Sequence, residues 1–306
     1  MDREVFFRFL QSFSEAAPEA ELRLGEPMRE HTSFHIGGGA DLFVLPSGEE
    51  DLRTGLRLCR AYDIPFFLLG NGTNLLVGDR GIRGVVFSMS RLSQVSINGT
   101  RIRAGAGAPL IGLARQAAQA QLTGLEFAGG IPGSLGGAVM MNAGAYGGEM
   151  SRVVRSVRIL EEDDTVREVP GEEMAFGYRT SRLMTQGGAV LSAVLELAPG
   201  DPEAIRARMR ELALQRQAKQ PLEHYSAGST FKRPEGYFAG KLIQDAGLKG
   251  YAVGPAQVSE KHAGFVINRG GATAAQVLEL METVRARVKE QSGVTLEPEV
   301  RLVGEF

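Results

Sequence analysis

Residues 129–148 read GGIPGSLGGAVMMNAGAYGG, and the interpretation of the whole sequence starts from this stretch. Eight of the twenty residues are glycine, and none carries a charge. Glycine adopts positive φ at little cost and lets another surface approach the backbone closely. Backbone N–H groups in such a turn can bind an anion without a lysine or arginine. Two interpretations are open: a phosphate- or pyrophosphate-binding loop, or a glycine-rich turn packed between other elements.

The common phosphate-binding motifs are absent from the sequence. There is no G-x-x-x-x-G-K-[ST], which excludes a P-loop. There is no Rossmann G-x-G-x-x-G either, because the nearest match, Gly105-Ala106-Gly107, lacks the third glycine. A dinucleotide would therefore have to bind on another fold.

Length and charge favour a globular protein of two or three domains. The 306 residues are sufficient for that number. A formal net charge of −2 argues against a general nucleic-acid binder. No segment resembles a signal peptide, and no apolar run has the length of a membrane span, so we expect a cytoplasmic protein without a membrane partner.

Cysteine and histidine usage predicts neither a disulfide nor a metal site. Cys59 is the single cysteine and follows a helical apolar pattern, so we interpret it as a core residue rather than a catalytic thiol. The four histidines have no metal-ligand spacing, and we expect no metal. They are His31, His35, His224 and His262.

The order of predicted elements indicates a small α/β unit followed by α+β segments. Apolar periodicity predicts helices over 2–16, 47–62 and 110–120, with capping boxes at Ser47/Glu50 and Thr273/Gln276 that begin two helices. Further helices are predicted from Pro202 to before Pro221 and from Thr273 to near Gly293. Strands are predicted over 42–45, 66–69 (buried), 75–77, 85–87, 95–97, 102–104, 153–160, 166–169, 189–197 and 300–303. The predicted domains are 1–92, 93–200 and 201–306.

Four short segments carry candidate functional groups, each with a structural alternative. The turn 70–74, GNGTN, offers two glycines and three hydrogen-bonding side chains: a second dinucleotide loop, or an ordinary turn. Arg179 can contact a carboxylate or phosphate with two N–H groups, whereas we interpret Arg182 as a surface residue. Ser229 near two cations can donate a proton to a strongly basic centre, or cap a turn. Glu297 and Glu299 flank a proline, as acids in a site or as solvated carboxylates.

A hydrolase triad is excluded, because no G-x-S-x-G and no signature Ser/His/Asp spacing occurs. Taken together, the segments resemble the UDP-N-acetylenolpyruvoylglucosamine reductase family, flavoenzymes of peptidoglycan synthesis. The resemblance extends in the same order through 32–40, 70–77, 129–148, 177–181, 228–234, 239–250, 258–268 and 296–304. Residues His31, His35 and Arg233 depart from the residues common in the family.

The resemblance implies an α+β protein: a two-part FAD-binding domain of the vanillyl-alcohol-oxidase type and a C-terminal α+β substrate-binding domain. The final strand would return toward the flavin. Because Tyr178-Arg179 leads quickly into the 189–197 strand, the chain is similar to the shorter family subtype, which lacks an inserted tyrosine loop. The implied cofactors are non-covalent FAD and NADPH, and the implied substrate is a UDP-sugar; no obligate protein partner is indicated.

The resemblance also implies the site residues. The catalytic positions would be Arg179, Ser229 and Glu299. The FAD-binding positions would be Gly70, Asn71, Gly72, Thr73, Asn74, Leu75, Gly130, Ile131, Pro132, Gly133, Ser134, Gly136, Gly137, Ala138, Asn142, Ala143 and Gly144. Substrate contacts would come from Tyr178, Lys232, Lys241 and His262, although the three last could equally be surface residues.

The implied reaction gives each catalytic residue a task. NADPH reduces the flavin, and hydride then moves to the terminal carbon of an enolpyruvyl group. Arg179 would meet the negative charge that develops, and Ser229 would protonate the neighbouring carbon. Glu299 would either hydrogen-bond the enolate or orient Arg179. Two rival interpretations are an oxidase of the same superfamily and a non-catalytic sugar-nucleotide sensor.

Overall fold

The computed structural model describes residues 3–306, which form two compact units. Unit 1 comprises, of the described residues, 3–23, Phe43–Asn71 and Gly84–Arg216. Unit 2 comprises Leu24–Leu42, Gly72–Arg83 and Gln217–Phe306. Each unit is thus assembled from three separate parts of the chain, whereas the sequence predicted three consecutive domains; that division stays a prediction.

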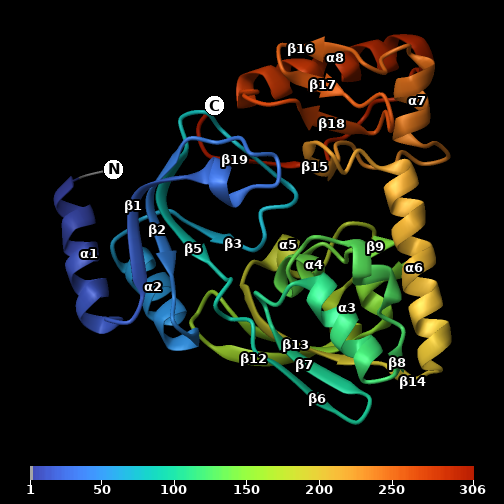
Figure 1. Cartoon of the computed structure of the whole chain (residues 1–306). Helices are drawn as coiled ribbons and strands as arrows, with labels where there is room; N and C mark the ends of the chain where they lie inside the picture. Colours follow the sequence, from blue (N-terminus) through green and yellow to red (C-terminus); the bar gives the residue numbers. More distant parts are fainter. Residues whose placement is uncertain (1–2) are drawn as a thin grey trace. The chain divides into compact units, whose positions relative to one another are not determined.

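Most helices and strands of the described residues are labelled in Figure 1. The α-helices are α1 Arg3–Ala16, α2 Glu49–Ala61, α3 Leu110–Gln119, α4 Leu135–Met140, α5 Leu183–Gln186, α6 Pro202–Lys219, α7 Ala239–Asp245 and α8 Ala274–Ser292. The strands are β1 Glu21–Pro27, β2 Gly39–Leu45, β3 Phe66–Leu69, β4 Leu75–Val77, β5 Ile82–Ser88, β6 Val95–Asn98, β7 Arg101–Gly105, β8 Leu122–Thr123, β9 Gly144–Ala145, β10 Gly148–Glu149, β11 Val154–Leu160, β12 Val166–Pro170, β13 Ala189–Glu196, β14 Ala198–Pro199, β15 Tyr225–Ser229, β16 Ala252–Val253, β17 Ala256–Val258, β18 Phe265–Asn268 and β19 Arg301–Val303. Residues 3–306 also contain four short 3-10 helices: η1 Met28–His31, η2 Glu126–Gly130, η3 Met150–Arg152 and η4 Gly171–Met174.

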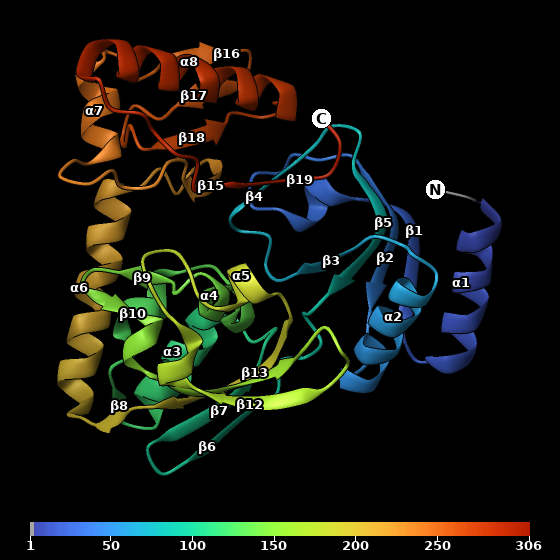
Figure 2. The ribbon, with the colours of Figure 1, turned by 180° about the vertical axis from the view of Figure 1, so that it is seen from behind.

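The largest sheet of unit 1 has the order β12-β11-β13-β7-β6, and its described pairs are antiparallel. Helices α3 and α4 cover one face of this sheet (Figures 1 and 2). The sequence of β7 shows why, because Ile102 and Ala104 are buried while Arg101 and Arg103 alternate onto the exposed face. The strands predicted for this region are confirmed.

A second sheet has the order β1-β2-β5-β3. Strand β3 lies at its edge and pairs only with β5, in parallel, so that Phe66 remains 37 % exposed. The prediction of a fully buried strand was therefore wrong at its first residues. Helix α1 packs its Phe9 and Phe13 rings 5.8 Å apart, and Phe13 meets the Phe87 ring edge-on. Cys59 of α2 is buried and free, as expected, and burial raises the pKa of its thiol to about 12.

The two predicted capping boxes have different outcomes. At α8 the Thr273 hydroxyl accepts from Gln276 N, and the Gln276 side chain accepts from Thr273 N, which confirms that box. At α2 the box was wrong. Ser47 lies one residue too early, because Gly48 is the N-cap, and the Ser47 hydroxyl donates to Asp51 instead of accepting from the helix.

Unit 2 contains the sheet β15-β18-β17-β16, against which α8 packs, as the orange and red ribbon of Figure 1 shows. Helix α8 buries Val277, Leu280, Val284 and Val288, a spacing typical of an amphipathic helix. The predicted last strand is confirmed as β19. It pairs in parallel with β4, with Arg301 opposite Leu75, so the end of the chain returns beside residues 75–77.

Within residues 3–306, no helix combines the length and the apolar character required to cross a bilayer.

Candidate active site

In unit 1, the turn at Gly70 and Asn71 lies against the glycine-rich segment. The Asn71 Nδ2 group donates to Pro132 O over 2.9 Å. A Cβ added to Gly70 would collide with the Ser134 hydroxyl, which is buried. Two of the predicted FAD-binding segments, 55 or more residues apart in sequence, are therefore neighbours, and a side chain at position 70 would force the Ser134 hydroxyl to move.

The segment 129–148 folds as two different structures. Its first part enters α4, and the N–H groups of Leu135 and Gly136 donate to Ala108 O and Ala106 O. A Cβ on Gly136 would lie only 3.0 Å from Ala106 Cβ. This part keeps the character of a close-approach loop.

The second part of the segment is a hairpin of β9 and β10. Its turn has positive φ at Tyr146 (52°) and Gly147 (84°), as a type I′ turn requires. A Cβ on Gly148 would meet the Phe127 ring at 2.5 Å. Here the glycines serve packing, so the turn interpretation describes 144–148, whereas phosphate binding stays a prediction for 130–138.

Arg179 occupies a tight turn closed by reciprocal backbone bonds between Gly177 and Thr180. Its φ is +55°, a left-handed conformation that costs free energy for any residue with a Cβ. Its Nη1 lies 3.5 Å from Gly144 O, and its guanidinium lies 5.5 Å from the Tyr178 ring centre. An arginine in a strained turn where glycine would be easier indicates a functional side chain.

Side chains tie this turn to the end of the glycine-rich segment. Asn142 is buried; its Nδ2 donates to Gly177 O (3.1 Å), and its Oδ1 accepts from Ser151 N (2.9 Å). The Ser181 hydroxyl donates to Met140 O (2.8 Å). Asn142, predicted to bind FAD, thus also links the Arg179 turn to residues 140–144.

In unit 2, the second half of the 70–75 segment lies beside the Glu299 segment. Asn74 Nδ2 donates to Glu299 O over 3.0 Å, and Arg301 N donates to Asn74 O over 3.0 Å. Gly72 has φ +61°, and a Cβ there would collide with His31 O. Glycine is therefore required at position 72 for backbone reasons, independent of any ligand.

Ser229 and Glu299 come together in unit 2 through Thr230, whose carbonyl accepts from Glu299 N (2.9 Å). An isolated bridge between Phe231 and Pro298 extends this pairing. Ser229 is partly buried, and its hydroxyl has no hydrogen-bond partner among residues 3–306. The described part of the chain thus leaves this hydroxyl available to a substrate.

The predicted substrate residues of unit 2 differ in their surroundings. Lys232, three residues after Ser229 in the sequence, has its Nζ 3.3 Å from Glu297 Oε2. The Lys241 side chain is 65 % exposed and pairs with Asp245 on α7. Lys241 therefore has the surface-residue surroundings that the sequence left open.

His262 is partly buried and held in one tautomer. Its Nδ1 accepts from Gly264 N (3.1 Å), which leaves the proton on Nε2. Burial lowers the pKa of His262, and nearby Lys249 lowers it further. The carbonyl of Gly264 in turn accepts from Thr230 N (2.9 Å), so this neutral imidazole is connected to the Ser229 segment through one residue.

Two residues that sequence reasoning did not select are part of these arrangements. Thr230 links Ser229 to Glu299, as described above. Arg216, near the end of α6, packs against Gly130: a Cβ added to Gly130 would lie 3.1 Å from Arg216 Cδ. Burial lowers the pKa of Arg216. Arg216 is one of several arginines in a charged helix, and Thr230 resembles any core residue of a strand, so the sequence offered no signal for either.

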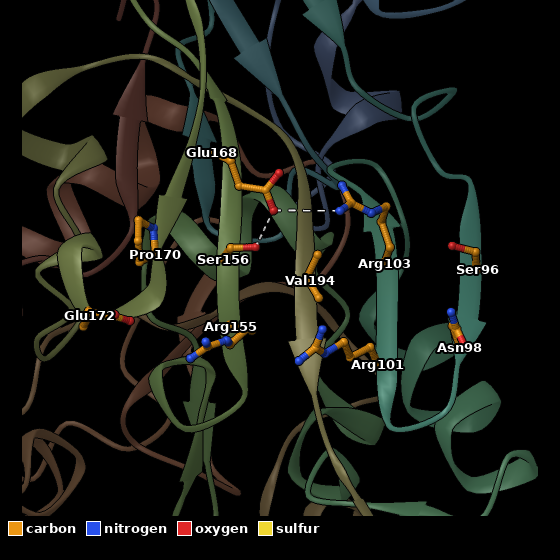
Figure 3. A pocket seen from close by; sticks show the side chains of 10 residues that line it. All are labelled: Ser96, Asn98, Arg101, Arg103, Arg155, Ser156, Glu168, Pro170, Glu172 and Val194. Carbon is orange, nitrogen blue, oxygen red and sulfur yellow. Dashed lines mark hydrogen bonds and ion pairs between the residues drawn. The ribbon is translucent and has the colours of Figure 1, made fainter.

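A separate hollow of ≈ 550 Å³ lies on the exposed face of the five-stranded sheet. Figure 3 shows Arg103 and the Ser156 hydroxyl both directed at Glu168. Arg101 is paired with Glu196. None of the predicted site residues lines this hollow. Within residues 3–306, no three His, Cys, Asp or Glu side chains gather in a way that could hold a metal ion.

Comparison with known proteins extends over almost the whole chain. Residues 40–170 match the FAD binding domain family, and residues 220–303 match the C-terminal domain of UDP-N-acetylenolpyruvoylglucosamine reductase. The UDP-N-acetylenolpyruvoylglucosamine reductase of Caldanaerobacter subterraneus subsp. tengcongensis is 52 % identical over 296 residues, 97 % of this chain and 98 % of the relative. That of Clostridium perfringens strain SM101 is 48 % identical over 299 residues, 98 % of each chain.

Solved structures agree. The UDP-N-acetylenolpyruvylglucosamine reductase of Thermus caldophilus has a TM-score of 0.80 at 38 % identity, covering 93 % of this chain and 98 % of that chain. A variant of berberine bridge enzyme has a TM-score of 0.50 at 14 % identity, covering 63 % of this chain and 44 % of that one, a likeness of fold alone. The predicted fold class, α+β with a FAD-binding domain of the vanillyl-alcohol-oxidase type, is confirmed. The chain belongs to the UDP-N-acetylenolpyruvoylglucosamine reductase family and is an FAD-containing oxidoreductase.

Proposed function

We propose that this protein uses NADPH to reduce UDP-N-acetylglucosamine enolpyruvate to UDP-N-acetylmuramate, a cytoplasmic step of peptidoglycan synthesis. The observation that carries the proposal is the placement of Ser229 and Glu299 on adjacent backbone segments, in a chain whose relatives bear the reductase name. We expect no obligate protein partner for this reaction.

The residues of the predicted FAD segments fit a bound dinucleotide. At Gly70 and Gly136, a side chain would collide with Ser134 and crowd Ala106, so glycine at both positions lets these segments pack closely, and we expect the cofactor to lie along them. No histidine or cysteine stands in either segment, which favours non-covalent binding. When bound, FAD supplies the hydride that adds to the terminal vinyl carbon, having received it from NADPH.

The chain's own residues handle charge and proton. In this proposal, the Arg179 guanidinium stabilises the negative charge that develops on the enolate and carboxylate of the substrate. Ser229 donates its hydroxyl proton to the carbon adjacent to the one that receives hydride, because a carbanion is basic enough to deprotonate an alcohol. The hydride and this proton together saturate the double bond, and the serine recovers its proton from solvent.

Two further side chains support these steps. Lys232, three residues after Ser229, lowers the cost of forming the alkoxide through its positive charge. Glu299 hydrogen-bonds the enolate or orients Arg179. Tyr178, Lys232, Lys241 and His262 contribute the substrate contacts, with His262 as a neutral Nε2–H donor.

One experiment separates this function from its rivals. The purified protein is expected to be yellow, to bleach with NADPH under anaerobic conditions, and to recolour on addition of the enolpyruvyl sugar nucleotide. Recolouring by oxygen alone would indicate an oxidase of the same fold. A colourless protein that still binds the sugar nucleotide would indicate a sensor.

A further inference from the structure

The strand that carries Ser229 is interrupted next to that residue. Along β15 and β18, Ser226 lies opposite Ile267, yet Ser229 lies opposite Phe265, so one residue of β15 is extra. Gly228 has φ +77°, within this β-bulge. A bulge bends its strand and redirects the side chains that follow, and it leaves part of the backbone ladder without its regular partner.

A side chain takes over the missing ladder bond. The N–H of Val266, a residue that is almost fully buried, donates to Thr230 Oγ1 over 2.9 Å rather than to a carbonyl of β15. Thr230 itself is 1 % exposed. Its hydroxyl therefore takes the place of the β15 carbonyl that would accept this hydrogen bond in a regular ladder.

The backbone of the same residue makes the two other links. Thr230 N donates to Gly264 O, and Thr230 O accepts from Glu299 N, each over 2.9 Å. On its other side, the Glu299 carbonyl accepts from Asn74 Nδ2 over 3.0 Å. A shift of Thr230 would thus move Ser229 directly and Glu299 through one hydrogen bond.

We propose that Thr230 is a positioning residue: its hydroxyl anchors the bulged strand to β18 and thereby sets the placement of Ser229 relative to Glu299. This inference rests on the proposed catalytic roles of those two residues. Thr230 touches neither substrate nor cofactor in the proposal. Its effect on the reaction passes through the backbone on either side of it.

The hydroxyl is the group at issue, because valine has nearly the shape of threonine but cannot accept a hydrogen bond. Thr230→Val leaves the buried Val266 N–H without an acceptor, and a buried donor without a partner is unfavourable. The segment relaxes by moving away from β18. A displacement on the order of 1 Å at a catalytic group can lower a rate about 10²-fold.

The test compares three variants of the full-length flavoprotein by anaerobic stopped-flow. Thr230→Val removes the hydroxyl, and Thr230→Ser keeps it. Thr273→Val is the matched control, because Thr273 Oγ1 also accepts a backbone N–H, that of Gln276, in the same unit. For each protein, flavin reduction by NADPH and flavin reoxidation by the enolpyruvyl sugar nucleotide are followed separately, together with Tm.

We expect Thr230→Val to reoxidise its flavin about 10- to 100-fold more slowly, with flavin reduction within about twofold of the wild type. Thr230→Ser should restore reoxidation. Thr273→Val should lower Tm while both half-reactions stay normal. This pattern distinguishes positioning from a general loss of stability, which would not single out one half-reaction.

The inference is overturned if Thr230→Val reoxidises at the wild-type rate, while the proposed function stands as long as the wild type itself recolours with the sugar nucleotide. A wild type that does not recolour refutes both. If Thr230→Val does not fold, Thr230→Ala decides the matter: it removes the same hydroxyl without placing a methyl group against Val266 N, and normal reoxidation in that variant overturns the inference.

Discussion

The Arg179 turn of unit 1 and the Ser229–Glu299 pair of unit 2 are held in place by different kinds of bond. Arg179 lies in a strained turn that the side chains of Asn142 and Ser181 attach to residues 140–144. Ser229 and Glu299 lie on backbone segments joined to each other through Thr230. The first arrangement depends on particular side chains, whereas the second depends mainly on chain path and on one hydroxyl.

This difference predicts whether a substitution changes stability, reaction rate or both. In unit 1, Arg179 carries both the backbone strain and the proposed chemical role. Replacing it with glycine should therefore relieve the strain and remove the role together. In unit 2, the Ser229 hydroxyl has no partner in the described chain, so removing it should leave stability unchanged. Strain and chemistry are thus coupled in one region and separate in the other.

Arg179→Gly gives the largest expected effect and tests the coupling in unit 1. Glycine adopts φ +55° without strain, so the free energy of unfolding should rise by about 1 kcal/mol. Loss of the guanidinium should slow flavin reoxidation by the enolpyruvyl substrate about 10²- to 10³-fold. Denaturant unfolding and stopped-flow measure the two effects.

Ala175→Gly is the matched control for Arg179→Gly, because Ala175 is exposed and also has a positive φ, 46°. It should gain stability without loss of activity. An Arg179→Gly variant that is less stable than the wild type would show that the arginine side chain stabilises the turn, and would break the comparison.

Ser229→Ala tests the separation in unit 2. Flavin reduction by NADPH should stay nearly normal, and reoxidation by substrate should slow about 10²-fold or more. The melting temperature should stay within about 1 °C of the wild type, since no described hydrogen bond is lost. Rapid reoxidation in the stopped-flow trace would refute the proton-donor role.

Gly70→Ala tests whether the close approach in unit 1 serves the cofactor. The added Cβ would collide with Ser134 Oγ, and overpacking of this kind costs about 1–3 kcal/mol. We expect FAD affinity to fall about tenfold or more, measured by flavin fluorescence in a titration of apoprotein.

Gly112→Ala is the control for Gly70→Ala. Its Cβ would lie 4.0 Å from Pro109 Cβ, in ordinary contact within α3. It should bind FAD normally and gain about 0.5–1 kcal/mol of stability, since alanine favours a helix over glycine. Equal FAD affinities in both variants would contradict a role of Gly70 in FAD binding.

The smallest effect concerns His262 and pH. Burial lowers the pKa of this imidazole below its ordinary value of 6.5, so the unfolded chain binds the proton more readily than the folded one. The corresponding stability is present above about pH 6.5 and is lost as pH falls toward the folded pKa. His262→Gln should flatten the decline of Tm between about pH 7 and pH 5. A decline as steep as that of the wild type would contradict this account.

Local patterns predicted much of this fold because they depend on neighbouring residues. Apolar periodicity located α1 and α3, Pro202 marked the start of α6, and the Thr273/Gln276 box marked the start of α8. The same reasoning was wrong at Ser47, where Asp51 captures the hydroxyl, and at Phe66, where the edge position of β3 exposes the ring. Both errors concern partners that a sequence pattern does not specify.

The sequence by itself determined the family, and with it the candidates Arg179, Ser229 and Glu299, because those residues stand in recognisable motifs. Only the tertiary structure decided that Thr230 joins Ser229 to Glu299, that Asn142 supports the Arg179 turn, and that 129–148 forms a loop, helix α4 and then the β9–β10 hairpin. The physical reason is that a motif records which groups the chemistry needs, whereas their placement depends on hydrogen bonds between backbone segments. Such bonds use N–H and C=O groups that every residue carries, and they leave no mark in the sequence.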